Sequence, residues 1–144
     1  VHALVNAIGE MRHVPHEAGF IAIKVDDIAE VNARFGFDAG DRVLAESAAC
    51  LMDCSRGKGR LFRSTGPTFV ALFDELGPEA IDEIASDIER FLGSPVLIGS
   101  LEYQPPIRVA TLHLDAVDRQ PVSILNELKA RLIEAPQVPG TKLD

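Results

Sequence analysis

The sequence predicts a single α/β domain of the ferredoxin-like type, in which one mostly antiparallel sheet is flanked by helices. Stretches with strand-like and helix-like hydrophobic periods alternate along the 144 residues, a length that suits one hydrophobic core. Two β-prone runs within 60–73 flank a tight polar turn, as in an antiparallel hairpin. An adjacent antiparallel pair fits this architecture better than a doubly wound parallel sheet. We expect helices on both faces of the sheet or together on one.

Each element is predicted by its hydrophobic period and by the residues at its ends. Asp26 and Asp27 are expected to cap one helix and Ser123 another, while Gly36 and Pro136 end helices. In chain order we expect a helix at 1–12, a strand at 19–25, helices at 27–35 and 38–54, a hairpin at 60–73, a helix from 78 to Gly93, a small hairpin at 95–104 turning at Gly99-Ser100, a strand at 107–114 and a helix at 123–135.

Composition excludes several classes of partner. The formal net charge of -8 argues against general binding to nucleic acid or anionic membranes, because both require Lys and Arg to neutralise phosphates. No apolar run approaches the roughly 20 residues of a membrane span, and no export signal opens the sequence, so we expect a cytoplasmic domain without membrane insertion. Cys50 and Cys54 are interpreted as small apolar residues in a reducing compartment.

The hairpin at 60–73 is a natural place for a reactive group, yet its turn carries hydroxyls and a proline, with no carboxylate, histidine or cysteine. Its centre reads Arg63-Ser64-Thr65-Gly66-Pro67-Thr68-Phe69. Upstream, residues 20–44 form a predicted strand and two helices. The polar and glycine residues at fixed spacing in this stretch are Asp26, Asn32, Gly36, Gly40 and Asp41.

These two stretches resemble the GGDEF domain family of diguanylate cyclases. The family pattern, roughly D-x-D-x-F-K-x-x-N-D-x-x-G-H-x-x-G-D, matches residues 24–41 without a gap, and the family motif R-x-G-G-D/E-E-F falls on the hairpin turn. The resemblance covers about residues 3–134. It implies the palm-like sheet shared with nucleotide cyclases. Active members of the family condense two GTP molecules into cyclic di-GMP across a homodimer, with divalent metal held by carboxylates.

Several functional positions depart from the family. Lys24 stands where the family has its first metal-binding Asp, and Pro67 stands where it has the second metal carboxylate. Thr65 replaces the first glycine of the motif and Thr68 replaces its Glu, while Gly66 and Phe69 are kept. We therefore expect no catalytic residue, no metal site and no cofactor; Mg²⁺ would be needed only by an active cyclase.

Some binding positions are retained. Asn32 and Asp41 match residues that hydrogen-bond guanine, and Lys24 could neutralise phosphate in place of a metal. The structural alternative is that Asp41 caps or charges the start of the helix at 38–54 and that Asn32 hydrogen-bonds the next loop. In the C-terminal helix, Lys129 or Arg131 could contact phosphate.

The family's product-inhibition motif R-x-x-D is vestigial here. Arg56 matches its arginine, but Gly59 stands in place of its aspartate. Arg56 could still meet a phosphate together with neighbouring basic residues. The alternative, which we favour, is a solvated basic loop in an acidic protein.

We therefore predict that residues 1–135 form a degenerate GGDEF domain and that 136–144 form a linker, leading to a further domain such as an EAL phosphodiesterase. The predicted function is a catalytically inactive regulatory module of cyclic di-GMP signalling that binds GTP or cyclic di-GMP or mediates homodimerisation. One alternative is an active diguanylate cyclase with a remodelled metal site. The other is a protein interaction domain that binds no nucleotide.

Overall fold

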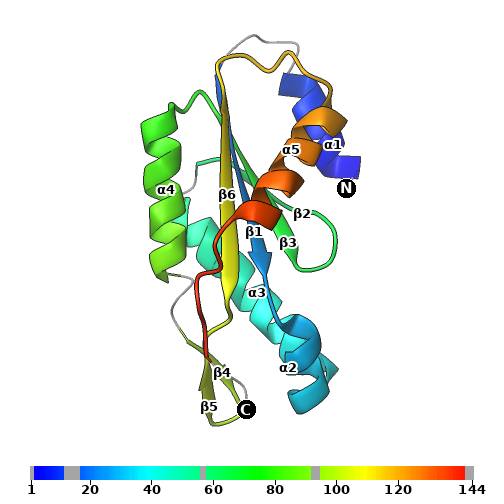
Figure 1. Cartoon of the computed structure of the whole chain (residues 1–144), viewed down its shortest axis with the longest axis vertical. Coiled ribbons are helices and arrows are strands. Elements are labelled where there is room, and N and C mark those ends of the chain that lie inside the picture. The colour runs from blue at the N-terminus through cyan, green and yellow to red at the C-terminus, as the bar shows by residue number, and fades with distance from the viewer. Residues whose placement is uncertain (1, 12–16, 56–57, 92–94, 142–144) are drawn as a thin grey trace.

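The central feature is a four-stranded sheet in the order β2-β3-β1-β6, in which every neighbouring pair is antiparallel. A computed structural model of the protein describes residues 2–11, 17–55, 58–91 and 95–141 (Figure 1). The elements in chain order are α1 (His2–Met11), β1 (Ala18–Val25), α2 (Ile28–Phe35), α3 (Phe37–Cys54), β2 (Arg60–Arg63), β3 (Thr68–Asp74), α4 (Pro78–Phe91), β4 (Val96–Ile98), β5 (Leu101–Tyr103), β6 (Ile107–Leu114) and α5 (Pro121–Glu134). The predicted order and fold class are confirmed.

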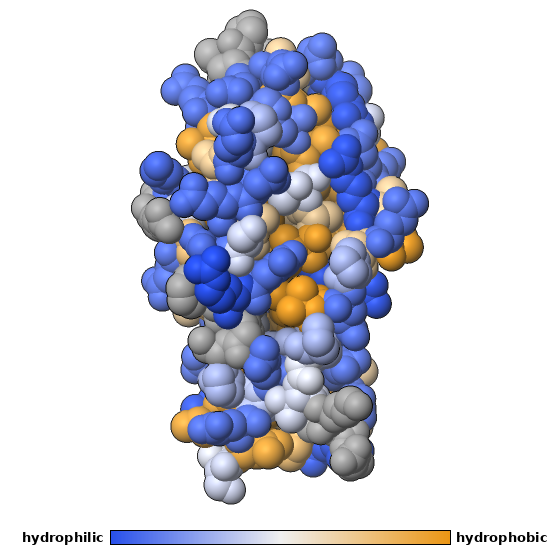
Figure 2. All heavy atoms as spheres, turned by 60° about the vertical axis from the view of Figure 1, so that its left-hand side comes forward, coloured by the Kyte–Doolittle hydropathy of each residue, from blue (hydrophilic) through white to orange (hydrophobic). Residues whose placement is uncertain are grey.

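Helices cover both faces of the sheet. Successive side chains of a strand point to opposite faces, so β1 feeds two separate cores. Phe20 and Ala22 pack with α1 and α5, whereas Ile21 and Ile23 pack with α2, α3 and α4. Figure 1 shows α4 and α3 on one side of the sheet and α1 and α5 on the other. Figure 2, with the α4 side turned forward, shows mainly hydrophilic residues on that surface.

The helix ends differ locally from the prediction. Asp27 precedes α2 in a left-handed conformation, with φ of 66°, and its side chain makes no capping hydrogen bond. Ser123 lies inside α5, which begins at Pro121, and its Oγ accepts a 3.0 Å hydrogen bond from Arg119. Gly36 ends α2 as predicted, with φ of 93°. Among the described residues, no helix combines the length and apolar character that crossing a bilayer requires.

Both cysteines lie in the C-terminal part of α3. Cys54 is buried and Cys50 half-buried, and their sulfurs lie 4.0 Å apart as free thiols. Burial raises the pKa of Cys54 to about 12 and also raises that of Cys50. Both thiols are therefore protonated at neutral pH, which confirms their interpretation as small, mostly apolar side chains.

After α5 the chain turns back along the sheet and packs against β6 and the end of β5 (Figure 1). We call residues 135–141 the C-terminal strap. Val138 and Ile107 exchange backbone hydrogen bonds of 2.7 and 3.1 Å. The Thr141 amide donates to the Gln104 carbonyl at 2.7 Å, and the Gln104 amide donates to the Thr141 Oγ1 at 2.8 Å. A Cβ at Gly140 would overlap the backbone of residues 104–106. The predicted linker thus begins, up to Thr141, as part of the folded domain; a following domain stays a prediction.

Candidate functional site

A cleft of about 790 Å³ opens between the C-terminal end of β1, the β2–β3 turn and α5. Its volume falls within the range of small-molecule sites. Strand alternation explains its floor, because Ala22 and Lys24 of β1 and Val70 of β3 point to the α5 face. Its walls carry basic, acidic, hydroxyl and amide groups. The lining residues that bear them are Lys24, Arg108, Lys129, Asp26, Asp27, Ser64, Thr65, Thr68, Asn126 and Gln137.

Lys24 occupies the middle of a row across three strands. It pairs with Thr68 of β3 on one side and with Arg108 of β6 on the other. Two cations opposite each other on neighbouring strands repel, so this row requires a compensating negative charge. Asp26 supplies that charge, because its carboxylate lies 3.6 Å from the Lys24 ammonium and 3.1 Å from Arg108 Nε.

The contacts of the Asp26 carboxylate give it a structural role. Its side chain is only 11% exposed, and Gln137 of the strap donates a 2.7 Å hydrogen bond to the same Oδ2 that accepts from Arg108. Arg108 also donates from Nη1 to the Ala135 carbonyl at 2.8 Å. The carboxylate closest to Lys24 therefore joins β1, β6 and the strap.

The β2–β3 turn, where the family motif was predicted, is stabilised by contacts among its own residues. Arg63 donates from Nε to the Gly66 carbonyl at 2.9 Å, and its guanidinium lies 6.0 Å from the centre of the Phe69 ring. Gly66 has φ of 56°, a conformation that favours glycine. The Pro67 carbonyl accepts a 3.0 Å hydrogen bond from the Val25 amide, which ties the turn to β1.

Asn32 and Asp41 lie near each other but not in the lining of the cleft. The Asn32 Oδ1 accepts a 2.9 Å hydrogen bond from the Gly40 amide, and a Cβ at Gly40 would overlap the Asn32 side chain. Asn32 therefore joins α2 to α3. Asp41 is exposed and lies past the first turn of α3, whose N-cap residue is Gly36, so Asp41 does not cap this helix.

Two further predicted contacts can be placed. Arg131 donates a 2.8 Å hydrogen bond to the Thr111 carbonyl and forms a 3.2 Å ion pair with Glu127, whereas Lys129 lines the cleft. Arg56 lies outside the described residues. Further along the sequence, Lys58, Gly59 and Arg60 border a smaller pocket of about 330 Å³, and Gly59 has φ of 78° with no room for a Cβ next to the Leu72 carbonyl.

Three groups were missed by sequence reasoning. Arg108 and Gln137 reach Asp26 from 82 and 111 residues away, and no local pattern signals such a contact. The third is Tyr103, which is completely buried and whose hydroxyl has no hydrogen-bond partner among the described residues. Burial raises the pKa of Tyr103 to about 12, with added contributions from Asp27 and Glu30.

The cleft can attract an anion more readily than a cation. Three basic and two acidic side chains line it, although the whole chain carries a formal net charge of -8. Within the described part of the chain, no group of three or more His, Cys, Asp or Glu side chains is arranged to hold a metal ion. Of the two carboxylates that line the cleft, Asp26 is already engaged by Arg108, Gln137 and Lys24, so this lining is a poor fit for Mg²⁺, which is usually held by one or two carboxylates.

A family model described as diguanylate cyclase, GGDEF domain, matches residues 2–133. The chain belongs to the GGDEF family. The predicted family is thereby confirmed, and this GGDEF domain is of the type found in cyclic di-GMP signalling. A search of curated proteins finds no match.

Solved structures show the same fold for this GGDEF domain. The diguanylate cyclase SiaD from Pseudomonas aeruginosa, solved with its activator SiaC, is similar with a TM-score of 0.83 and 20% identity over 92% of this chain. The chain spans only 53% of that protein. An EAL/GGDEF domain protein from M. capsulatus is similar with a TM-score of 0.79 and 18% sequence identity, over 92% of this chain and 86% of that protein's chain. The FimX GGDEF domain from P. aeruginosa is similar with a TM-score of 0.81 and 15% sequence identity, over 93% of this chain and 83% of that chain.

Proposed function

We propose that this GGDEF domain is a catalytically inactive regulatory module of cyclic di-GMP signalling. The observation that carries the proposal is the group next to Asp26: an ammonium, Lys24, stands where the family pattern has a metal-binding carboxylate. Across from it, Pro67 offers a backbone carbonyl that is already bonded to Val25. Attack of a 3′-hydroxyl on a triphosphate needs strong charge stabilisation, which a metal supplies in the family. A fixed ammonium neutralises charge but does not lower the pKa of the attacking hydroxyl in the same way.

Incubation of the purified chain with GTP and Mg²⁺, followed by chromatography, tests the proposal. We expect no cyclic di-GMP, while an active diguanylate cyclase treated in parallel forms it. Product formation above a no-protein control would overturn the proposal and favour the alternative of a working cyclase with a remodelled metal site.

From the regulatory role we further infer a ligand, GTP, and a partner, a neighbouring EAL domain. Guanine recognition through Asn32 and Asp41 predicts a rise in melting temperature with GTP, because a ligand that binds only the folded state stabilises it. Asn32→Ala and Asp41→Ala should each reduce that rise. A shift that survives both would place the base elsewhere. A cytoplasmic location and a neighbouring EAL domain complete the proposal, and the full-length gene tests the latter.

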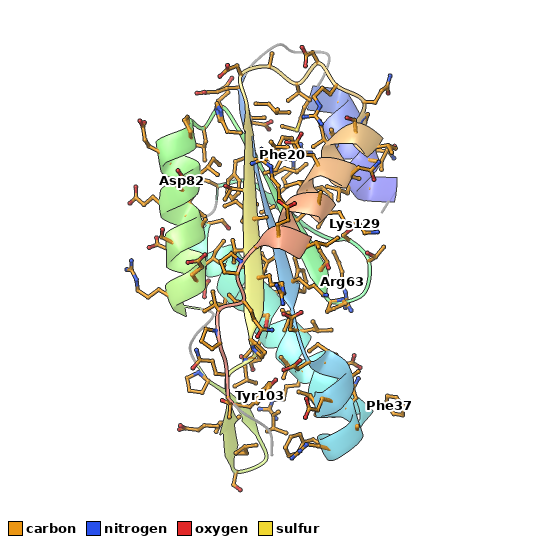
Figure 3. All side chains as sticks on the ribbon, in the orientation of Figure 1. Phe20, Phe37, Arg63, Asp82, Tyr103 and Lys129 are labelled. Carbon is orange, nitrogen blue, oxygen red and sulfur yellow. The ribbon has the colours of Figure 1, made fainter. Side chains whose placement is uncertain are left out.

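One exposed aromatic residue favours an additional contact role. Phe37, at the start of α3, is 84% exposed and points away from the body of the domain (Figure 3). Aromatic residues are enriched in protein interfaces. If Phe37 mediates homodimerisation, Phe37→Ser should lower the sedimentation-equilibrium mass of a dimer to that of the monomer. A mass that is already monomeric in the unsubstituted chain would remove this role.

A further inference from the structure

The strand β6 lies at an edge of the sheet and has a neighbouring strand, β1, on one side only. Backbone groups of an antiparallel strand point alternately to its two sides. Ile107 exchanges hydrogen bonds with Val138 of the strap on the side away from β1. The amides of Val109, Thr111 and His113 follow at intervals of two and therefore point to that same open side, whereas the residues between them bond β1. We call the backbone of these three residues the β6 edge.

The β6 edge has unused hydrogen-bonding capacity. No described residue accepts a hydrogen bond from its three amides. The strap pairs with β6 at Ile107 as an isolated bridge and does not continue along the strand. The Thr111 carbonyl accepts a 2.8 Å hydrogen bond from the Arg131 side chain, which shows that a donor outside the sheet can reach this edge. Unpaired amides and carbonyls in a row are a template for one more strand.

Two helices border the β6 edge without closing it. α4 and α5 both pack against β6, on opposite faces of the sheet. Figure 2, with the α4 side turned forward, shows a strip of apolar and weakly polar residues that runs down the middle of this surface between hydrophilic borders. Val109, Thr111 and His113 are themselves partly exposed. An extended segment that approaches from outside therefore meets the edge between the two helices.

The flank of α4 on the outer side is acidic. Asp87 marks the flank next to α3, because it is buried and its carbonyl lies 3.8 Å from Cys54 Sγ. With 3.6 residues per turn, Asp82 and Glu89 lie two turns apart on the other flank, which faces away from α3. Both are exposed and form no ion pair with any described residue; Asp82 is labelled on α4 in Figure 3. Two uncompensated carboxylates therefore stand beside the β6 edge.

We propose that the β6 edge binds an extended, basic segment of another protein as an additional antiparallel strand. The strap, which pairs with β6 in the same direction at Ile107, shows that the edge accepts an extended chain. Side chains directly opposite each other in an antiparallel pair lie on the same face of the sheet. Val109 belongs to the face that α4 covers. Every second side chain of the added strand therefore projects toward α4, where Lys or Arg meets Asp82 and Glu89.

A second copy of this chain suits the β6 edge less well than a basic partner. A twofold axis at the edge would place α4 next to its own copy, with the two acidic flanks facing each other. Like charges in an interface disfavour that pairing. On the α5 side, Arg131 and Glu127 form a 3.2 Å ion pair and so add little net charge. The inference goes beyond the proposed regulatory role, because it does not depend on whether a nucleotide is bound or converted.

Amide hydrogen exchange of the 144-residue chain, measured by NMR at low salt with and without the peptide KVKVKVK, tests the pairing. Its lysine side chains all lie on one face of an extended strand and its valines on the other. We expect exchange at the amides of Val109, Thr111 and His113 to slow about tenfold when the peptide is saturating. The amides of Ala110 and Leu112, which already bond β1, should change little. Purely electrostatic attachment of the peptide would not produce this alternation.

Fluorescence anisotropy of the labelled peptide measures the affinity. Methylation of the lysine backbone nitrogens keeps the charges but removes the amide donors, and should raise the dissociation constant about tenfold. The double variant Asp82→Asn, Glu89→Gln should raise it about fivefold, with weaker binding in added NaCl. The matched control, Glu46→Gln with Asp53→Asn, removes two exposed acidic charges from α3 and should change it little.

Failure of the peptide to bind, equal affinity of the methylated peptide, or protection that does not alternate along β6 would overturn the proposal. Protection of the same three amides without peptide, increasing with protein concentration, would show that a second copy occupies the edge and would also overturn it. Melting curves of both double variants should coincide with that of the original chain, which separates a lost contact from a lost fold. Formation of cyclic di-GMP would refute the inactive module and leave this inference unaffected.

Discussion

The Asp26 carboxylate and the Arg108 guanidinium, 82 residues apart in the sequence, lie 3.1 Å from each other at the edge of the cleft. Their contact links β1 to β6, and Gln137 adds the C-terminal strap to the same oxygen. Asp26 is thus a structural residue in the lining of the cleft. Its position explains how Lys24 and Arg108 are tolerated on adjacent strands.

Removing the cation from this pair should be costly. Arg108→Gln leaves a largely buried carboxylate with one donor fewer, so we expect the free energy of unfolding to fall by about 2 kcal/mol. Urea denaturation followed by circular dichroism measures it. Lys24→Gln is the matched control: it removes a longer, half-exposed contact and should cost less than about 0.5 kcal/mol. Equal losses of unfolding free energy from the two substitutions would show that the Asp26–Arg108 contact stabilises the fold no more than the Lys24–Asp26 contact.

The strap predicts a contrast between two glycines. Gly140→Ala places a methyl group against the backbone of residues 104–106, and overpacking of this kind costs about 1–3 kcal/mol unless the strap detaches. Gly9 lies within α1 with open space around its Cα, so Gly9→Ala should stabilise by about 0.5–1 kcal/mol. Urea midpoints of the two variants should move in opposite directions. Hydrogen exchange at the Val138 amide distinguishes strain from detachment, since a detached strap loses protection there.

Tyr103 is the only tyrosine of the chain, so its ionisation can be followed directly by ultraviolet absorbance. Burial raises its pKa to about 12 in the folded protein, above the ordinary value of about 10. The unfolded chain therefore releases the phenol proton first, and the stability contributed by this group is lost as pH rises from about 10 through about 12. Titration in urea should return the ordinary pKa. A folded-state pKa at the ordinary value would contradict the burial of this hydroxyl.

The same hydroxyl predicts an unusual substitution. Because its oxygen is buried without a partner among the described residues, Tyr103→Phe removes an unsatisfied polar group and leaves the ring in place. We expect the free energy of unfolding at neutral pH to rise by about 1 kcal/mol. Chemical denaturation at pH 7 provides the measurement. A loss of stability instead would reveal a hydrogen bond from the hydroxyl.

Restoring the missing carboxylates should restore affinity for a metal. Lys24 and Pro67 flank the point where the turn meets β1, so the double variant Lys24→Asp, Pro67→Glu places two new carboxylates beside Asp26. We expect Mn²⁺ to raise the melting temperature of the double variant by a few degrees and that of the original chain by less than about one degree. Each single variant serves as a control. An equal shift in the original chain would show that it already holds the ion.

The arrangement of secondary structure was predictable because it depends on local signals. Apolar residues at helical spacing and the turns at Gly36, Gly66 and Gly99 place the described helices and strands to within a few residues; the helix end predicted at Gly93 lies outside the described residues. Helix capping was predicted less well: Asp27 has the right chemistry for a cap, but its backbone is left-handed and its side chain makes no capping hydrogen bond. Which faces the helices cover depends on packing between distant segments, which the sequence left open.

The candidate site was predictable only where the family spacing names positions. Lys24, Pro67 and the turn were found in this way, and Lys24 does line a cleft. Asn32 was expected at a nucleobase, with a structural bond as the alternative, and its bond to Gly40 now gives that alternative a definite partner. Arg108, Gln137 and the strap were not found, because their contacts with Asp26 span most of the chain and leave no periodic trace in sequence.

The strap also gives the cleft a mechanical connection. A pull on Thr141 must first break its bonds to Gln104 and the Val138–Ile107 pair before the load reaches Gln137, and through it Asp26 and Lys24. The bonds nearer the end of the strap therefore shield the Gln137–Asp26 contact from small displacements of position 141.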